Sequence, residues 1–393
     1  MDNRNTTLVF DPIPFKGGSK IATSDALNVC DNSSCQFVVL TVEPEYWEGT
    51  ELYSQHDVKV TKIWHSAWLM KHHQGYLYWL NQCLLLCQLL LALLRFNRVH
   101  QVVGASGPGI DMPIYLAQAL FSFQVTQMVH GNVGVSRSIG YCLTKADAVF
   151  YLPSTRPSLK AALEVYLANV TGVADTHSLA ECYLKSASYQ SFVNGLPESR
   201  WPTQSQQHLP ICFWAASLLK WKGLDLFVES LKTCSEFRPI SANICFIRPK
   251  DTCLPISDAP INIRHTNWYD DPSDLDYIRS QSNIFVSTSQ NEPFGLSILE
   301  ALAAGMCVII PQDGAFWDTR LTHDENCIKY QPDDAQSLVN ALLYASNDSR
   351  VLERCQTNAL ATAQQYKAEY RYLRFAQHLN GDTVTPIMRI CDQ

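Results

Sequence analysis

Short apolar runs separated by helix-like segments recur along the chain, and the clearest group lies in its C-terminal third. Residues 283–288 and 306–310 are rich in Ile, Val and Phe, which is typical of buried parallel strands. Between them, Pro293 suits a first helical turn and Gly305 suits a left-handed residue after a helix end. The pattern therefore predicts a strand–helix–strand unit with a helix over 293–304.

The rest of the chain repeats this alternation, which predicts an α/β protein with parallel sheets. A length of 393 residues suffices for two domains, each with its own core. The polar segment 194–210 separates two apolar blocks, so we expect domains over 1–200 and 201–365 and a terminal segment over 366–393. The other predicted strands are 7–10, 37–42, 101–105, 124–130, 148–152, 242–247 and 261–264, and a final helix is predicted over 349–379.

Residues 76–96 form the most apolar run in the chain and are long enough to raise the question of a membrane span. Asn81, Gln82 and Gln88 interrupt the run, and a helix followed directly by a strand fits a globular α/β layer. We therefore predict a buried helix, with an interfacial helix as the alternative. Basic and aromatic residues around it favour a peripheral membrane contact through residues 64–96.

Charge and cysteine content narrow the class of protein. A net charge of −7 argues against nucleic acid as a bulk partner, because binding to its backbone requires a concentrated positive field. The 14 Cys show no paired C-x-x-C spacing, and the first residues lack the long apolar stretch of a secretory signal. We expect a cytoplasmic protein with reduced thiols and without structural zinc.

The predicted helix after residue 293 could bind an anion. The first N–H groups of a helix lack intrahelical partners and carry partial positive charge, so Phe294, Gly295 and Leu296 could donate to a phosphate. Glu292 and Glu300 would then lie on either side of the anion, which favours a diphosphate placed between a ribose and a sugar. Alternatively, the two acids are a helix cap and part of a solvated face.

The segment EPFGLSILEALAAG resembles the E-x7-E signature of glycosyltransferase family 4. The resemblance implies the GT-B fold, in which two Rossmann-like domains face a central cleft, and a final helix that returns to the N-terminal domain. It also implies retention of configuration, a nucleoside-diphosphate sugar as co-substrate, and neither a metal ion nor another cofactor. Glu292 would lie near the transferred sugar, and Glu300 would bind the ribose.

The N-terminal half offers two weaker signals. Gly17 and Gly18 follow the first predicted strand, where a Gly-Gly pair permits a tight turn and close ligand approach but is more often an ordinary loop. His130 ends the strand 124–130, and ligands of open α/β sheets bind at the carboxyl ends of strands, although a single His is usually structural. The resemblance implies that the glycine loop faces the cleft and that His130 contacts the transferred sugar.

The resemblance also implies that an Arg and a Lys hold the donor diphosphate, and here the chain departs from the family pattern. Lys222 matches the Lys, but Ser217 stands in the Arg position and cannot form a bidentate contact with phosphate. Lys220 is a candidate to compensate. Asp274 and Asp276 spell a D-x-D motif, which we interpret as the first turn of a helix and not as a metal site.

Together with these features, the resemblance implies a metal-independent, retaining hexosyltransferase that acts on a hydroxyl acceptor. The expected acceptor is a glycan or a lipid-linked glycan of surface polysaccharide synthesis, met at the cytoplasmic face of a membrane. Glu292, His130 and Lys222 are the expected catalytic residues. The alternatives are a catalytically silent subunit that binds a nucleotide sugar, which would explain Ser217, and a nucleotide-sugar epimerase of the same fold.

Overall fold

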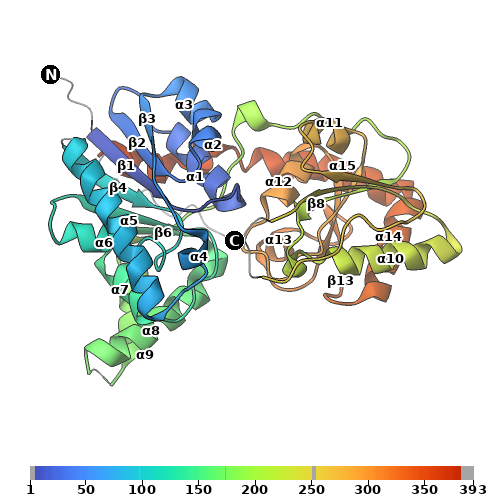
Figure 1. Ribbon diagram of the computed structural model, residues 1–393. Helices are drawn as coiled ribbons and strands as arrows, with labels where there is room; N and C mark the ends of the chain where they lie inside the picture. Colours follow the sequence, from blue (N-terminus) through green and yellow to red (C-terminus); the bar gives the residue numbers. More distant parts are fainter. Residues whose placement is uncertain (1–4, 97, 173, 250–253, 382–393) are drawn as a thin grey trace. The chain divides into compact units, whose positions relative to one another are not determined.

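The computed structural model describes residues 5–96, 98–172, 174–249 and 254–381, which form two compact units (Figure 1). Unit 1 is Met1–Gly195 with Ala368–Gln393, and unit 2 is Leu196–Lys367. The sequence placed these boundaries after residues 200 and 365, a few residues away. Each unit contains one sheet in which every paired strand is parallel to its neighbour.

The sheet of unit 1 has seven strands in the order β3-β2-β1-β4-β5-β6-β7, so the chain reverses its direction of growth between β1 and β4. Its strands are β1 (Asn5–Asp11), β2 (Cys35–Thr41), β3 (Val58–Lys62), β4 (Val99–Gly104), β5 (Gln124–Val129), β6 (Ala148–Tyr151) and β7 (Tyr189–Ser191). Its helices are α1 (Gly18–Asn28), α2 (Pro44–Glu48), α3 (Glu51–Gln55), α4 (Ala67–Met70), α5 (Gly75–Arg95), α6 (Met112–Gln118), α7 (Arg137–Lys145), α8 (Arg156–Val170), α9 (Thr176–Lys185), α16 (Ala368–Arg371) and α17 (Leu373–Asn380).

Helices cover both faces of this sheet, because successive strand residues point to opposite sides. On one face, Val125 belongs to a core cluster that includes Leu85 and Leu89 of α5. On the other face, the hydroxyl of the neighbouring residue Thr126 lies 2.9 Å from Nε2 of His378 in α17. The end of the described chain is therefore part of the unit 1 core.

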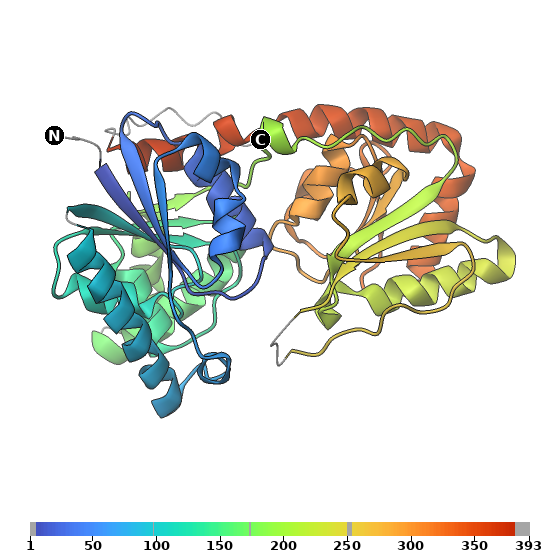
Figure 2. The same ribbon diagram turned by 45° about the horizontal axis from the view of Figure 1, so that its top comes forward.

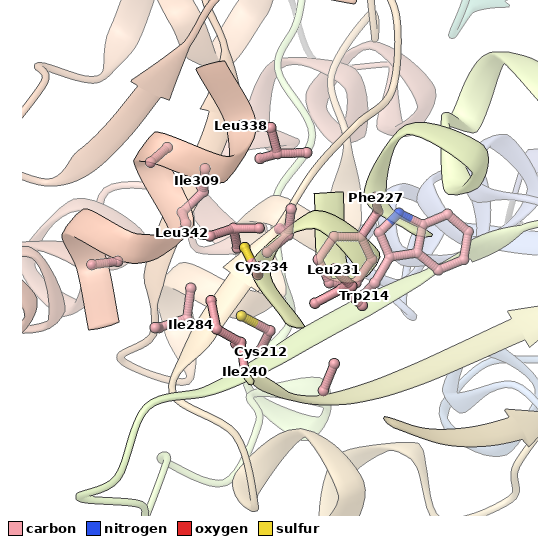
Figure 3. Close-up of a cluster of buried hydrophobic side chains, with 14 of the residues drawn as sticks. Cys212, Trp214, Phe227, Leu231, Cys234, Ile240, Ile284, Ile309, Leu338 and Leu342 are labelled. Carbon is pink, nitrogen blue, oxygen red and sulfur yellow. The ribbon is translucent and has the colours of Figure 1, made fainter. Parts of the chain in front are cut away.

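The sheet of unit 2 has six strands in the order β10-β9-β8-β11-β12-β13, with the reversal between β8 and β11. Its strands are β8 (Ile211–Ser217), β9 (Ser241–Ile247), β10 (Thr266–Asp270), β11 (Ile284–Val286), β12 (Cys307–Pro311) and β13 (Cys327–Tyr330). Its α-helices are α10 (Leu224–Phe237), α11 (Leu275–Ser280), α12 (Leu296–Ala303), α13 (Phe316–Arg320), α14 (Ala335–Asn347) and α15 (Ser349–Gln364). Figure 3 shows Trp214 of β8 meeting Phe227 and Leu231 of α10 in the core.

Most predicted strands are confirmed apart from their end residues, but three element predictions are wrong. No strand forms over 261–264; Ile261 and Ile263 instead pack beside the core, and the edge strand is β10. The final helix is broken into α15, α16 and α17, because Tyr366 accepts a hydrogen bond from the backbone of Leu196 (2.8 Å). The third correction concerns α12.

Helix α12 begins at Leu296, three residues after the predicted start at Pro293. Gly295 precedes it with a φ of 76°, a left-handed conformation that favours glycine. Because this conformation is not helical, the helix cannot extend back beyond Leu296. Pro293 and Phe294 therefore belong to the loop between β11 and α12. Gly305 has a φ of 68°, as predicted for the residue after the helix.

Helix α5 confirms the helix predicted over 76–96 but is buried on one side only. An 18-residue window of this helix has a mean hydropathy of 1.8 and is 39% buried, so the helix is long and apolar enough to cross a membrane. Its buried side contacts the sheet and includes the polar residues Asn81 and Gln82. Tyr78 donates a hydrogen bond to the carbonyl of Gly109 (2.8 Å), which ties the helix to the rest of unit 1.

Candidate functional site

The reversal of strand order marks the candidate site in each unit. In open parallel sheets, the loops that leave the carboxyl ends of the two strands at the reversal diverge and leave a crevice for a ligand. In unit 2 these loops follow β8 and β11, and in unit 1 they follow β1 and β4. The residues predicted to bind the phosphates or the ribose of the donor all lie near the loops after β8 and β11 in unit 2.

The loop after β8 is fixed to the loop after β11 by the backbone of Gly223. Gly223 has a φ of 73°, and a Cβ at this position would lie 2.1 Å from the carbonyl oxygen of Thr288. The Thr288 hydroxyl donates to the carbonyl of Lys222 (2.9 Å), and the backbone N–H of Gln290 donates to the carbonyl of Trp221 (3.0 Å). Only glycine fits this contact, which holds Lys222 beside the second loop.

The N-terminus of α12 presents two backbone N–H groups that have no partner within the described part of the chain. Ile298 and Leu299 already donate their N–H groups to the carbonyl of Gly295, at 3.1 and 3.4 Å. The N–H groups of Leu296 and Ser297 precede the first intrahelical bond, and both residues are half-buried. Leu296, which was predicted as a donor, and Ser297 are thus the first donors of the helix itself, whereas the predicted Phe294 and Gly295 precede the helix in the loop.

Lys222 and Glu292 form an ion pair at this helix end. Their side chains are 18% and 17% exposed, so the pair is partly shielded from water. The Lys222 ammonium also lies 4.0 Å from the centre of the Trp221 ring. Beside Glu292, a cavity of about 10 Å³ is lined by Ser287, Ser289 and residues of α12, β12 and α13. That volume holds about one water molecule, so a larger ligand would bind on the surface of unit 2.

Glu300 lies inside α12 and is held by two arginines. Its Oε1 accepts from Nη2 of Arg200 (2.9 Å), and its Oε2 accepts from Nη2 of Arg279 (2.8 Å). Each carboxylate oxygen can accept one further hydrogen bond, so a ribose hydroxyl could still reach Glu300. Removing the Glu300 charge would leave Arg279, whose side chain is only 7% exposed, without one of its two carboxylate partners.

A second positive charge at this helix end comes neither from position 217, where the family pattern has an Arg, nor from Lys220. Ser217 ends β8 and is half-buried. Lys220 is turned to Asp225, with 2.6 Å between ammonium and carboxylate, and that hydrogen bond raises the pKa of Lys220. Lys220 therefore does not compensate for Ser217. Among the described residues, Lys222 is the lysine that the loop after β8 directs to Glu292.

The D-x-D carboxylates have structural partners. Asp274 is the residue before α11, as the sequence predicted. Asp276 accepts hydrogen bonds from the hydroxyl of Thr203 (2.7 Å) and from Nη1 of Arg279 (3.1 Å). Because Arg279 also holds Glu300, Asp276 helps to orient that arginine.

An aromatic cluster supports the loop between β11 and α12. The buried Phe294 ring lies 4.8 Å from the Phe316 ring and 5.2 Å from the Trp317 ring, centre to centre. The indole N–H of Trp317 donates to the carbonyl of Gly295 (3.2 Å). Phe294 is thus a packing residue whose side chain does not face the donor position. Asp313 accepts from the backbone N–H of Asn291 (2.9 Å), which fixes the same loop from the β12 side.

In unit 1, the loops after β1 and β4 line a cavity of about 190 Å³. Gly17 and Gly18 lie at the start of α1, on the β1 side of this cavity. Neither has a positive φ, and Gly17 is extended with a φ of −136°, which fits the ordinary loop expected as the more common case for such a pair. The lining includes Asp11, Ser19, Lys20, Thr23 and Ser106.

Lys20 carries the buried cation of this cavity. Its side chain is 3% exposed, and its ammonium lies 3.1 Å from a carboxylate oxygen of Asp11 and 2.9 Å from one of Glu43. It also donates to the carbonyl of Ile13 (2.8 Å). The indole N–H of Trp47 donates to the same Asp11 oxygen (2.7 Å). Two carboxylates thus face one ammonium, which suits hydroxyl groups better than a further anion.

His130 follows β5 and reaches this cavity through Thr23. Its Nε2 lies 3.0 Å from the Thr23 hydroxyl, and its ring meets Phe192 edge-on at 5.5 Å. Burial lowers the pKa of His130 to about 4, so the imidazole is neutral at pH 7. Its buried Nδ1 has no hydrogen-bond partner among the residues that the structure describes.

The residues that hold the predicted site residues in place were not identified from the sequence. Arg200 and Arg279 come from segments far from α12 in sequence, and no local pattern connects them with Glu300. Trp317 and Asp313 were missed for the same reason. Lys20 had a usable signal, because a lysine in the first turn of a helix is unfavourable beside the positive helix end and needs a local carboxylate.

Comparisons with known proteins find a family match that falls within unit 2. Residues 197–362 match the family model described as glycosyl transferases group 1. Among curated proteins, sucrose-phosphate synthase 1 of Arabidopsis thaliana is 28% identical over 103 residues, which are 26% of this chain and 10% of that protein. The match therefore spans about a tenth of the length of this relative.

Solved structures resemble almost the whole chain. The Anabaena protein HepE in complex with UDP and glucose has a TM-score of 0.67 at 14% identity, with 96% of this chain and 100% of that chain covered. The sucrose-phosphate synthase of Thermosynechococcus elongatus has the same TM-score and identity, with 96% and 99% covered. These likenesses confirm the predicted GT-B fold.

The buried imidazole of His130 predicts a specific pH dependence of stability. Below pH 6.5 the unfolded chain binds a proton at this residue that the folded chain takes up only near pH 4, so stability falls as the pH is lowered. His130→Gln should remove up to about 2 kcal/mol of this loss at pH 5. The check is the melting temperature of both proteins at pH 8 and pH 5, with His73→Gln at an exposed histidine as the control. Parallel pH profiles for wild type and His130→Gln would contradict the burial.

Proposed function

We propose that this chain, which carries a domain of the glycosyl transferases group 1 family over residues 197–362, transfers a sugar from a nucleoside-diphosphate sugar to a hydroxyl acceptor. The observation that carries the proposal is the open N-terminus of α12 beside Lys222, at the strand reversal of unit 2. Solved structures of the same fold contain UDP with glucose, UDP alone or UDP-glucose, which supports a nucleotide-sugar donor.

In this proposal, the N–H groups of Leu296 and Ser297 and the Lys222 ammonium bind the donor diphosphate. When the bond between the sugar C1 and the phosphate oxygen breaks, negative charge grows on the diphosphate. The helix end and Lys222 are already oriented toward that charge, so they stabilise it more in the transition state than in the ground state. Lys222 must then leave or share its pairing with Glu292 when the donor binds.

The two glutamates act on hydroxyl groups. Glu292, released from Lys222, would accept hydrogen bonds from the transferred sugar, and Glu300 would accept from the ribose while Arg200 and Arg279 hold its orientation. We further propose retention of configuration by front-face attack. The acceptor oxygen bonds to C1 on the face that the phosphate leaves, and the acceptor proton passes to a phosphate oxygen, so no protein nucleophile is required.

The cavity of unit 1 is proposed to bind the acceptor. Asp11, Lys20 and Thr23 present polar groups there, and the excess of carboxylates favours a hydroxyl-bearing glycan over an anion. His130, neutral at pH 7, would serve as a hydrogen-bond partner near this cavity through Thr23. A glycan or lipid-linked glycan of surface polysaccharide synthesis, met at the cytoplasmic side of a membrane, is the substrate class that we propose.

One observation favours a second candidate, a catalytically silent subunit. Ser217 stands where the family resemblance implies a phosphate-binding Arg, and Lys220 is paired with Asp225. A protein with this loss could bind a nucleotide sugar without transferring it. The two candidates differ in whether a nucleoside diphosphate is released.

The proposal predicts saturable donor binding followed by metal-independent turnover. A thermal-shift panel of UDP, GDP and ADP sugars should raise the melting temperature with one base, because a ligand that binds only the folded state stabilises it. The stabilising sugar should then release its nucleoside diphosphate when acceptor is added, and excess EDTA should leave the rate unchanged. Binding without release would favour the silent subunit, conversion without an acceptor would favour an epimerase, and loss of turnover in EDTA would refute the metal-free mechanism.

Lys222→Ala should lower turnover about 100- to 1000-fold, which corresponds to ~2.7 to 4 kcal/mol of transition-state stabilisation. The matched control is Lys220→Ala, because this neighbouring lysine is 51% exposed and pairs with Asp225 outside the site. The control should turn over at nearly the wild-type rate. If Lys222→Ala had nearly wild-type turnover while Lys220→Ala lost most of its turnover, the phosphate site would lie elsewhere in the loop.

A further inference from the structure

Helix α5 presents an unusual outer face to solvent. Residues at positions 76, 79, 80, 83, 84, 87, 91 and 94 are exposed, and their spacing of three or four residues places them on one side of the helix. All eight are apolar, aromatic or cysteine: Tyr76, Trp79, Leu80, Cys83, Leu84, Cys87, Leu91 and Leu94. We call this set the α5 outer face. At 1.5 Å per residue it runs for roughly 30 Å without a charged group.

The exposure of the larger side chains is high for an apolar surface. Tyr76 is 82% exposed, Leu91 68% and Leu94 65%, whereas a surface helix of a soluble protein normally presents charged residues on this side. Figures 1 and 2 show α5 at the outside of unit 1. A contiguous apolar face of this kind marks an interaction surface.

Two tryptophans from the preceding segment are also exposed beside the helix. Trp64 is 61% exposed, and both its backbone groups bind the side chain of Gln88: the N–H donates to Oε1 (2.6 Å) and the carbonyl accepts from Nε2 (2.9 Å). Gln88 thus fixes an exposed indole next to α5. Trp68, 59% exposed, comes from α4 just before the helix. Trp and Tyr are the residues that prefer the boundary between lipid headgroups and acyl chains.

The chain segment that carries the α5 outer face is positively charged. Between residues 58 and 110 the chain has no Asp or Glu but has five Lys or Arg, in a protein whose net charge is −7. All five are exposed: Lys59, Lys62, Lys71, Arg95 and Arg98. Because the protein as a whole would be repelled by an anionic surface, this local excess of positive charge gives unit 1 a preferred orientation toward one.

We propose that the α5 outer face docks unit 1 on an anionic lipid membrane, with α5 lying in the plane of the interface. The helix lies on the membrane and does not cross it, because its opposite side carries Asn81 and Gln82 into the core and Tyr78 is bonded to Gly109. Leu91 and Leu94 enter the acyl region, the tryptophans lie at the headgroup level, and the basic residues contact lipid phosphates.

Native cysteines allow a direct test on the full chain. Cys83 and Cys87 lie on the α5 outer face, and Cys182 in α9 is exposed elsewhere on unit 1. The protein is incubated with vesicles of phosphatidylcholine alone or mixed with phosphatidylglycerol and is then treated with a water-soluble maleimide. Labelling is measured peptide by peptide by mass spectrometry. We expect anionic vesicles to slow the labelling of Cys83 and Cys87 by about tenfold or more while Cys182 reacts as before.

Cosedimentation with the same vesicles supplies the matched variants. The double variant Leu91→Ser/Leu94→Ser should weaken binding by about tenfold or more, whereas Phe237→Ser, at a residue of unit 2 that is 76% exposed, should leave it unchanged. Lys71→Glu/Arg95→Glu should weaken binding chiefly at low salt. Circular dichroism confirms that each variant is folded.

The proposal is overturned if anionic vesicles neither bind the protein nor protect Cys83 and Cys87. It is also overturned if the α5 outer face proves to be a contact between two copies of the chain. In that case, light scattering would show a dimer that Leu91→Ser/Leu94→Ser converts to a monomer, and thiol protection would depend on protein concentration but not on lipid. Both readouts are independent of catalysis, so failure of the glycosyltransferase proposal leaves them valid.

Discussion

The contact between Gly223 and Thr288 is the constraint on which the donor side of the site depends. It brings the loops after β8 and β11 so close that no side chain fits between them. The Thr288 hydroxyl adds a second link, because it accepts from the Trp214 indole (3.0 Å) and donates to the Lys222 carbonyl (2.9 Å). The core residue Trp214 is thereby connected to the backbone of the lysine proposed to bind phosphate.

This contact also sets the position of Lys222 relative to the N-terminus of α12. Lys222 is positioned beside Glu292, and the pair lies at the N-terminus of α12. The indole of Trp317 holds the carbonyl of Gly295, so the first turn of the helix is fixed from the other side. The site is thus built on rigid backbone and core side chains, which is the condition for electrostatic stabilisation without reorganisation.

Ion pairs hold the charged residues of both candidate sites in place. Lys222 pairs with Glu292, Glu300 with two arginines, and Lys20 with two carboxylates. Partly buried charges of this kind are costly unless they are paired. For Lys222 the pairing has a consequence for function, since a diphosphate must compete with Glu292 for the same ammonium.

The sequence was sufficient for the features that depend on local pattern. Apolar runs located most strands, and Gly305 correctly marked the end of α12. The start of α12 was wrong because Pro293 suits a helical turn equally well in a loop, and the left-handed conformation of Gly295 depends on tertiary contacts with Trp317. The break at Tyr366 likewise depends on a partner, Leu196, that is distant in sequence.

The candidate site shows the same division between local and long-range information. The E-x7-E spacing and the Lys-Gly pair can be read from the chain, and the structure brings Lys222 to Glu292. The arginines around Glu300 could not be predicted, because they come from segments that only the fold brings to α12. The position of Lys20 in the first turn of α1 indicated a nearby carboxylate, but only the fold shows that Asp11 and Glu43 supply it. The exposed side of α5 was also undetermined, since an apolar run of that length is compatible with a buried, an interfacial or a spanning helix.

The central claim is that the donor phosphates bind to the N-terminus of α12. Amide chemical shifts of the isotopically labelled chain during titration with UDP test it most directly. The account predicts that the amides of Leu296 and Ser297 show the largest shifts and that they saturate together with the binding isotherm. Saturable UDP binding that leaves these two amides unmoved, with the large shifts gathered at the start of α1 instead, would contradict it.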